Sequence, residues 1–254
     1  MNDANHNQAP SSRRGPSTLA IDVGGTGLKA SVLDDAGRML AKRVRVATPY
    51  PCHPDILLDA LADLTAPLPP SERISIGFPG VIRGGRVVTA PHFDIQTWHD
   101  YPLEKALSQR FSKPARLLND AEVQGLGIVT GTGLEVVLTL GTGVGSAVFS
   151  NGALAPHLEL AHHPIHKSGT YNDYVGNGAR HAHGPKKWNR RVLRMIEIVY
   201  SLLHYDVLYL GGGNASNVSV EDLADNVRIA SNDAGITGGI RLWDDKVWQA
   251  ICDN

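Results

Sequence analysis

Three glycine-rich turns, each directly after an apolar run, carry the strongest chemical signal in the sequence. The first is Asp22-Val-Gly-Gly-Thr-Gly27, the second is Gly141-Thr-Gly-Val-Gly145 and the third is Gly211-Gly-Gly213. Glycine lets backbone N–H groups approach a phosphate without interference from a Cβ atom. A single turn of this kind is equally an ordinary hairpin. Three of them favour a phosphate donor, such as a nucleotide, held between two similar domains.

Two charged residues flank the first turn. Asp22 ends the preceding apolar run, where its carboxylate can hold Mg²⁺ through a water shell, and Lys29 supplies a compensating positive charge. Apolar residues resume after the first two turns, which predicts strand–turn–strand hairpins. The second and third turns are not P-loops, because no Gly-Lys-Ser/Thr follows them. They do not suit a Rossmann fingerprint either, since the turn at 141–145 leads into a strand and not a helix.

The dipeptide Asn119-Asp120 is the best candidate for acid–base chemistry. It follows an apolar run and precedes a stretch with helical spacing, so Asp120 is expected in the first turn of a helix beyond a strand end. Phosphorylation of an alcohol needs a base that accepts the hydroxyl proton. The alternative is plain helix capping, with Asn119 as the N-cap and Glu122 as its capping-box partner.

A histidine-dense segment follows in the second half of the chain. Glu159 is surrounded by His157, His162, His163 and His166. Glu159 and His162 are three residues apart, so in a helix they share one face and can grip neighbouring sugar hydroxyl groups. Exposed loop histidines are the simpler interpretation. Zinc is not expected, because a stable site needs four ligands and no cysteine is near.

Residues 174–196 contain no acidic side chain and many basic ones. A basic stripe on one face of a predicted helix comprises Lys186, Lys187, Arg190, Arg191 and Arg194. Such a stripe can hold a polyanion, although most are only solvated helix faces.

The composition excludes several classes of protein. The chain of 254 residues has a net charge of −1 and two distant cysteines. A near-neutral chain has no global attraction to nucleic acid or membranes, and two distant cysteines imply no disulfide framework, which suits the cytoplasm. No apolar run reaches membrane-spanning length. The polar residues 1–16 are predicted to be a disordered tail and not a signal peptide.

The rest of the chain predicts an α/β protein with two similar halves. In the first half we expect, in order, strands at 17–23, 28–34 and 38–46, a helix at 55–64, a strand at 74–78, a helix near 102–111 and a strand at 115–118. The second half repeats the theme, with an amphipathic helix near 186–205. Residues 234–243 also have helical spacing, and whether this last helix packs back on the first half stays open.

These motifs resemble those of the ROK sugar kinases, most closely their small polyphosphate- or ATP-dependent glucokinase branch. The likeness covers residues 17 to about 243. The motifs that carry it are Asp22-Val-Gly-Gly-Thr-Gly, Phe78-Pro-Gly-Val81, Leu118-Asn-Asp-Ala121, Leu140-Gly-Thr-Gly-Val-Gly145, Glu159-Leu-Ala-His162, Gly211-Gly-Gly213 and Asn232-Asp-Ala-Gly-Ile236. The resemblance implies an actin-like ATPase (ribonuclease H-like) fold with two duplicated lobes and an interlobe cleft. The sugar and phosphate lobe would be 17–128 and the nucleotide lobe 129–254.

The resemblance also implies a role for individual residues. Asp120 would be the base on a hexose 6-hydroxyl. The implied sugar contacts are Asn119, Glu159, His162, Pro79, Gly80, His92 and Asn172. The implied donor contacts are Asp22, Gly24, Gly25, Thr26, Gly27, Lys29, Gly141, Thr142, Gly143, Gly145, Gly211, Gly212 and Gly213, with Asp22 also holding Mg²⁺. Residues 211–213 would face the adenosine of ATP.

Three positions depart from the family pattern. His92 stands where the family has a sugar-contacting Asn. Asn172 stands where it has a third sugar-binding acid, with Asp173 as a substitute if the register slips by one. Ala161 replaces the Gly of the Glu-x-Gly-His motif, and the family's zinc cysteines are absent. Each altered sugar contact is worth about 1–3 kcal/mol if buried and unpaired, enough to change the preferred sugar.

We therefore expect a cytoplasmic sugar kinase that uses Mg²⁺ and transfers a phosphoryl group from ATP or polyphosphate to the 6-hydroxyl of a hexose, with glucose as the first candidate. The alternative is a catalytically weakened homologue that senses a sugar or nucleotide. A DNA-binding regulator is not expected, because a helix-turn-helix needs several dozen residues before the first strand. The expected partners are the hexose and the donor, without nucleic acid or membrane, and a homodimer is left open.

Overall fold

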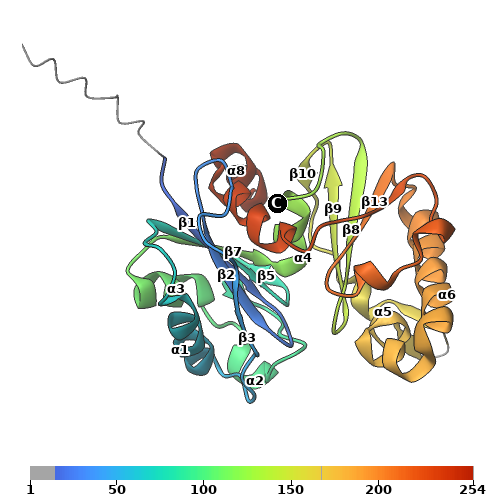
Figure 1. The fold of residues 1–254 in the computed structure, drawn as a ribbon, viewed down its shortest axis with the longest axis horizontal. Helices are drawn as coiled ribbons and strands as arrows, with labels where there is room; N and C mark the ends of the chain where they lie inside the picture. Colours follow the sequence, from blue (N-terminus) through green and yellow to red (C-terminus); the bar gives the residue numbers. More distant parts are fainter. Residues whose placement is uncertain (1–14, 167, 254) are drawn as a thin grey trace, which may run out of the picture.

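The computed structural model describes residues 15–166 and 168–253 as an α/β protein built on two five-stranded sheets (Figure 1). The first sheet contains β1 (Thr18–Val23), β2 (Leu28–Leu33), β3 (Val44–Val46), β4 (Arg73–Phe78) and β7 (Ala115–Asn119). The second contains β8 (Leu134–Leu140), β9 (Val144–Ser150), β10 (Ala153–Leu154), β13 (Val207–Gly211) and β14 (Val227–Ile229). Two small hairpins pair β5 (Ile82–Arg83) with β6 (Arg86–Val87) and β11 (Pro164–His166) with β12 (Gly169–Thr170).

The two large sheets have the same topology. Their orders are β3-β2-β1-β4-β7 and β10-β9-β8-β13-β14. In the first, β2 is antiparallel to β1 and β3, whereas β1, β4 and β7 are parallel. In the second, β9 is antiparallel to β8 and β10, whereas β8, β13 and β14 are parallel. The carboxyl ends of the parallel strands are the positions at which ligands bind in α/β sheets.

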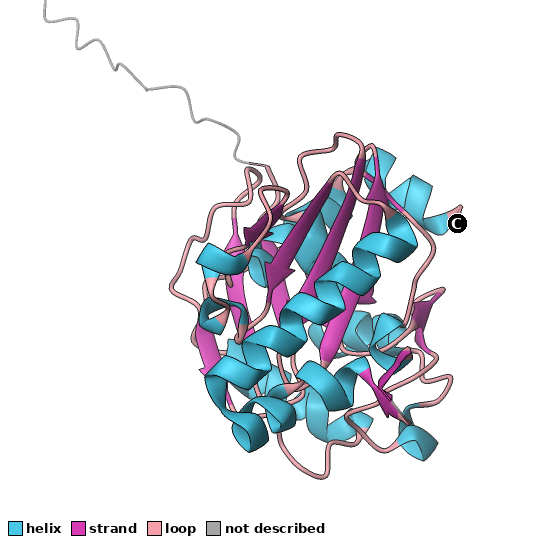
Figure 2. Cartoon of the chain, turned by 90° about the vertical axis from the view of Figure 1, so that its right-hand side faces the viewer, coloured by secondary structure: helices cyan, strands magenta, loops and turns pink. Residues whose placement is uncertain are grey.

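Helices cover both outer faces and fill the space between the sheets. The outer face of the first sheet carries α1 (Pro54–Thr65), α2 (Ile95–Trp98) and α3 (Leu103–Phe111). The outer face of the second carries α5 (Tyr171–Val175) and α6 (Asn177–Leu203), the long helix in front of the strands in Figure 2. Between the sheets lie α4 (Asp120–Leu126), α7 (Ala234–Thr237), the 3₁₀ helix η4 (Gly238–Trp243) and α8 (Asp245–Cys252) (Figure 1). Further 3₁₀ turns are η1 (Leu160–His162), η2 (Ala215–Asn217) and η3 (Val220–Asp222).

The alternation of side chains along the central strands builds these layers. In β1, Ile21 packs in the cluster with α1 and α3, whereas its neighbour Ala20 lies against Ile236 of α7. In β8, Val136 packs under α6, whereas Val137 joins the cluster around α4. Since successive side chains of a strand point to opposite faces, one apolar strand supplies two cores. No helix in the described part of the chain combines the length and apolar character needed to span a bilayer.

Several predicted elements differ in extent. The strand predicted at 38–46 is reduced to β3, and Ala41 instead accepts a hydrogen bond from the Ser31 hydroxyl at 2.8 Å. The helix predicted near 186–205 is the part of α6 that follows an interruption at Gly184, where φ is 70°, and ends at Leu203; α6 also includes the turns from Asn177 to this interruption. Residues 1–14 of the predicted tail lie outside the described residues. Gly15 donates its backbone N–H to Asp35 at 3.0 Å.

The end of the chain packs on the first sheet. Ser75 of β4 donates its hydroxyl to Gly239 O at 2.6 Å, and Trp243 Nε1 donates to the same hydroxyl at 2.9 Å. The guanidinium of Arg116 lies over the Trp243 ring, 4.4 Å from its centroid. The predicted helix at 234–243 changes from α to 3₁₀ at Gly238, which approaches the backbone of α4 too closely for a side chain.

We predict that Gly238→Ala destabilises the protein by about 3 kcal/mol. A Cβ atom at Gly238 would lie 2.0 Å from Val123 O, a backbone atom that cannot move without shifting α4. Urea unfolding followed by circular dichroism measures the change. The matched control is Gly178→Ala in α6, where a Cβ meets nothing within 4 Å and the change should stabilise by about 0.5 kcal/mol. Equal stabilities of the two variants would contradict the prediction.

Candidate active site

A cavity of about 530 Å³ collects residues from both sheets. Every residue that the sequence analysis assigned to the site lines this cavity, with the exception of Gly211. Gly211 is buried at the end of β13, where a Cβ atom would lie 2.7 Å from the side-chain oxygen of Gln124. Its lack of a side chain therefore serves packing against α4, and only Gly212 and Gly213 of that turn reach the cavity.

The first glycine turn is fixed by its own backbone and by the chain after β3. Gly24 N donates to Gly27 O at 3.0 Å, which closes the turn between β1 and β2. Thr48 donates its hydroxyl to Gly24 O at 2.7 Å, and the Tyr50 hydroxyl donates to Gly25 O. A Cβ atom on Gly25 would meet the His92 ring at 3.1 Å, so this glycine allows His92 to reach the cavity.

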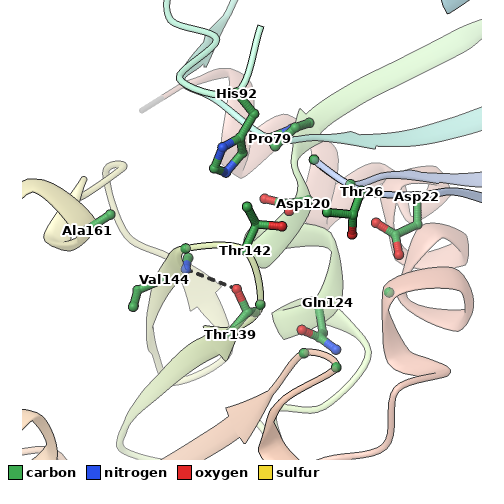
Figure 3. A pocket seen from close by; sticks show the side chains of 18 of the residues that line it. Asp22, Thr26, Pro79, His92, Asp120, Gln124, Thr139, Thr142, Val144 and Ala161 are labelled. Atoms are coloured by element: carbon green, nitrogen blue, oxygen red, sulfur yellow. Dashed lines mark hydrogen bonds between the residues drawn. The ribbon is translucent and has the colours of Figure 1, made fainter. Parts of the chain in front are cut away.

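The second glycine turn connects β8 to β9. Gly141 N donates to Gly143 O at 2.9 Å, and Gly145 N donates to Thr139 Oγ1 at 3.1 Å, the dashed bond in Figure 3. A Cβ atom on Gly141 would meet no other atom within 4 Å. Gly141 therefore faces open space, whereas Gly143 and Gly145 pack closely against Asn172 and Thr139.

Asn172 braces this second turn. Its side-chain oxygen accepts the Val144 N–H at 2.8 Å, and Asn172 lines the cavity. The neighbouring Asp173 is exposed, and its carboxylate accepts hydrogen bonds from Thr170 in a capping box at the start of α5. In α5, Asn172 therefore faces the cavity and Asp173 does not, so Asp173 does not take the place of Asn172.

The start of α4 confirms the predicted capping box. Asn119 Oδ1 accepts the N–H groups of Ala121 at 2.9 Å and Glu122 at 3.3 Å, and Glu122 in turn accepts the Asn119 N–H. Asn119 Nδ2 also donates to Gly80 O at 3.1 Å. Because Asn119 ends β7 and caps α4, Asp120 is held in the first turn at the sheet edge. Capping and a chemical role for Asp120 are thus compatible.

Asp120 is the most perturbed carboxyl group in the cavity. Burial, followed by the negative charge of Asp22, raises its pKa to about 7, and the hydrogen bond from Ala121 N acts in the opposite direction. Figure 3 shows Asp120 in the centre of the site, with Asp22 and Thr26 on one side and Thr142 on the other. A carboxylate with a pKa near neutrality is suited to accept a proton.

Asp22 is the side chain that fits a magnesium ion. Its carboxylate lies 2.7 Å from the Lys29 ammonium group beside the first glycine turn. In phosphate-transfer sites Mg²⁺ is usually held by one or two carboxylates, waters and the phosphates themselves. Within residues 15–166 and 168–253, no three His, Cys, Asp or Glu side chains form a metal site by themselves. One carboxylate beside a glycine turn fits an ion that is shared with a bound phosphate.

Glu159 and three histidines, His92, His157 and His162, also line the cavity. His157 Nε2 lies 2.7 Å from Glu159 Oε1, and His162 Nε2 lies 3.7 Å from Glu159 Oε2. The hydrogen bond from His157 is the main cause of the lowered pKa of Glu159, which stays ionised as an acceptor. Burial lowers the pKa of His92, so its neutral ring can donate one hydrogen bond and accept another.

Several lining residues were missed in the sequence. They are Arg43, Arg45, Gln124, His157, Asn177 and Asn214. The register of β2 and β3 places Arg45 directly opposite Lys29. This strand register cannot be deduced from the sequence alone. The sequence shows His157 only as part of a histidine-dense segment.

The basic stripe on α6 does not line the cavity. Arg191 donates to Tyr174 O at 3.1 Å and lies over the Tyr174 ring, and Arg194 is 3.1 Å from Glu197. Two of its five cations thus have partners on the protein.

The two mixed α/β sheets, with a cavity lined from both, fit an actin-like ATPase fold. The chain belongs to the ROK family, whose model matches residues 18–163. This membership confirms the resemblance seen in the motifs.

Relatives define the type of enzyme more closely. Polyphosphate glucokinase from Mycobacterium tuberculosis (strain ATCC 25177 / H37Ra) is 28% identical over 204 residues, 77% of each chain. The crystal structure of inorganic polyphosphate/ATP-glucomannokinase from Arthrobacter sp. strain KM superposes with a TM-score of 0.82 at 28% identity, covering 91% of this chain and 99% of the other. A ROK family glucokinase from Streptomyces griseus, in complex with glucose and AMPPNP, shares the fold with a TM-score of 0.76 at 21% identity, covering 89% and 98%. The protein is a phosphotransferase of the hexokinase/glucokinase type.

We predict that Asp120→Asn stabilises the protein at pH 8 by on the order of 1–2 kcal/mol, a reduced value because the cavity is open to solvent. The raised pKa means that ionisation of Asp120 opposes folding, so wild-type stability is lost as pH rises from the unfolded pKa near 3.8 to about 7. Thermal unfolding at pH 5.5 and pH 8 should show the larger gain at pH 8. Asp63→Asn, on the exposed side of α1, is the control and should show no such difference. A gain that does not grow with pH would refute this assignment.

Proposed function

We propose that this protein is a sugar kinase that transfers a phosphoryl group from ATP or polyphosphate to the 6-hydroxyl of a hexose, with glucose as the first candidate. The observation that carries the proposal is Asp120, a carboxylate with its pKa near 7, in a cavity bordered by two glycine-rich turns. The names of the relatives, a polyphosphate glucokinase and a polyphosphate/ATP-glucomannokinase, support both the donor and the sugar class.

The two sheets are, in this proposal, the halves of a duplicated two-lobe fold, 17–128 and 129–254. Their identical strand order and strand directions support the duplication. The cavity is then the interlobe cleft, because its lining comes from both sheets. The packing of η4 on β1 and β4 joins the end of the chain to the first lobe.

In the proposed reaction Asp120 accepts the proton of the sugar hydroxyl as the phosphoryl group is transferred. Asn119, Glu159 and His162 hold the sugar, together with His92, Asn172 and the Pro79-Gly80 turn. The backbone of the turns at 24–27 and 141–145 holds the donor phosphates, with Lys29 nearby. Magnesium held by Asp22 would neutralise charge on the transferring phosphate. Positioning and charge stabilisation carry most of such a reaction.

Two basic side chains, Lys29 of β2 and Arg45 of β3, are the proposed contact for a polyanionic donor. Lys29 and Arg45 are directly opposite in the antiparallel ladder, a pairing that is unfavourable for like charges unless an anion lies near. Lys29 forms an ion pair with Asp22. Arg43, the residue before β3, forms an ion pair with Asp233 at 2.9 Å. Arg45 has no ion-pair or hydrogen-bond partner among the described residues, and it lines the cavity beside Gly27.

The decisive experiment measures sugar phosphates formed from glucose, mannose and N-acetylmannosamine, each with ATP and with polyphosphate. Wild-type protein should phosphorylate at least one hexose, with kcat/KM falling below pH 7 as Asp120 becomes protonated. Asp120→Asn should lower kcat by about 10²–10⁴-fold, the usual contribution of a general base, while donor binding measured by calorimetry is retained. Full activity of this variant would remove Asp120 from the mechanism. No product from any sugar with either donor would favour the sensor alternative.

We predict that Arg45→Gln raises the KM for polyphosphate about tenfold, the equivalent of about 1.4 kcal/mol for one charge-assisted contact. The KM for ATP should change less, since its nucleoside is expected near Gly212 and Gly213 on the other sheet. Arg190→Gln, from the α6 stripe outside the cavity, is the matched control and should leave both values unchanged. A larger effect from Arg190 than from Arg45 would place the polyanion on α6.

A further inference from the structure

The ring of His157 lies between two carboxylates. Its Nδ1 is 2.6 Å from Glu122 Oε1 and its Nε2 is 2.7 Å from Glu159 Oε1. The His157 side chain is 14% exposed and that of Glu122 only 7%. We call these three side chains the carboxylate bridge. It joins helix α4 to the loop between β10 and η1, two segments that are far apart in sequence.

The geometry of the bridge requires a charged ring. A neutral imidazole carries one N–H, so one of the two short contacts would set a lone pair against a carboxylate. The imidazolium donates to both carboxylates. Burial by itself would lower the pKa of His157, but the hydrogen bonds and charges of Glu122 and Glu159 outweigh it and raise the pKa to about 9.

Each end of the bridge is attached to a different part of the proposed site. Glu122 is also the capping-box acceptor for Asn119 N, and so belongs to the helix start that carries Asp120. Glu159 lines the cavity, and its Oε2 lies 3.7 Å from His162 Nε2. The His157 ring therefore links Glu159 to the helix start that carries Asp120.

We propose that His157 is a positioning residue that holds the sugar-binding carboxylate of Glu159 at a fixed place relative to Asp120. The proposal rests on the proposed sugar-kinase function, because it assumes that Glu159 binds the hexose. His157 does not act on the substrate itself, since both of its ring nitrogens are engaged by carboxylates.

Loss of the ring would affect Glu159 in two ways. The buried carboxylate of Glu122 would lose its cationic partner, and its repulsion of Glu159 would no longer be screened. Glu159 would also lose the hydrogen bond that keeps it ionised and oriented as an acceptor. Sugar affinity should fall more than donor affinity, because the bridge does not include a residue of either glycine turn.

The bridge makes sugar binding dependent on pH. A His whose pKa is raised on folding stabilises the native state below its unfolded pKa near 6.5, and this stabilisation is lost as pH rises through about 9. Glu122 and Glu159 are the charged groups that face the ring. The dissociation constant of the sugar should therefore increase as pH passes 9 in the wild type, but not in a variant without the imidazole.

The test compares His157→Gln with His157→Lys by calorimetric titration of glucose without a donor, and by steady-state kinetics. At pH 7.5 the glutamine variant should bind glucose at least tenfold more weakly and show a raised sugar KM, with the donor KM changed less than twofold. The lysine variant keeps a cation that can donate to both carboxylates, so it should recover part of the lost affinity. His166→Gln, an exposed histidine of β11, is the matched control and should match the wild type.

Several outcomes would overturn the proposal. Glucose affinity within twofold of wild type in a folded His157→Gln protein would do so, as would equal losses in the glutamine and lysine variants. A wild-type protein that binds no glucose would instead contradict the assumed function. Titration of the His157 ring by NMR separates the two failures, because the ring should titrate near pH 9 whether or not sugar binds. A titration midpoint of the His157 ring near pH 6.5 would show that the two carboxylates do not hold the ring in its charged form.

Discussion

The geometry of the cavity depends on the N-cap of helix α4. Asn119 is the last residue of β7 and the N-cap of α4. Its side chain accepts hydrogen bonds from two helix N–H groups and donates one to Gly80 O. These bonds satisfy backbone donors that a helix start leaves free, so the helix begins at one defined residue. Asp120 therefore has a fixed position between the sheets. The glycine turns and the carboxylate bridge of Glu122, His157 and Glu159 lie around it.

Electrostatics in the cavity separate its carboxyl groups by protonation state. Burial and the charge of Asp22 raise the pKa of Asp120 towards neutrality, whereas the hydrogen bond from His157 is the main cause of a lowered pKa at Glu159. One group is thereby suited to exchange a proton and the other to remain a hydrogen-bond acceptor. Opposite shifts of neighbouring carboxyl groups are a general way to divide such roles.

Much of the fold and of the candidate site was predictable because the signals are local. The capping box at Asn119 spans four residues, and the turns at 24–27 and 141–145 are short glycine runs between apolar segments. The third turn shows the limit of such patterns. Gly211 resembles its neighbours in sequence, but it packs against Gln124, and only the fold distinguishes glycine needed for packing from glycine that faces a ligand.

The sequence by itself determined the α/β class, the family motifs and the position of Asp120 at a helix start, since periodicity and caps act over a few residues. Tertiary structure alone decided which charged side chains meet. His157 meets Glu122, which is 35 residues away in the chain, and Arg45 faces Lys29 through the register of β2 and β3. Such contacts depend on how distant segments pack, and no local pattern records that packing.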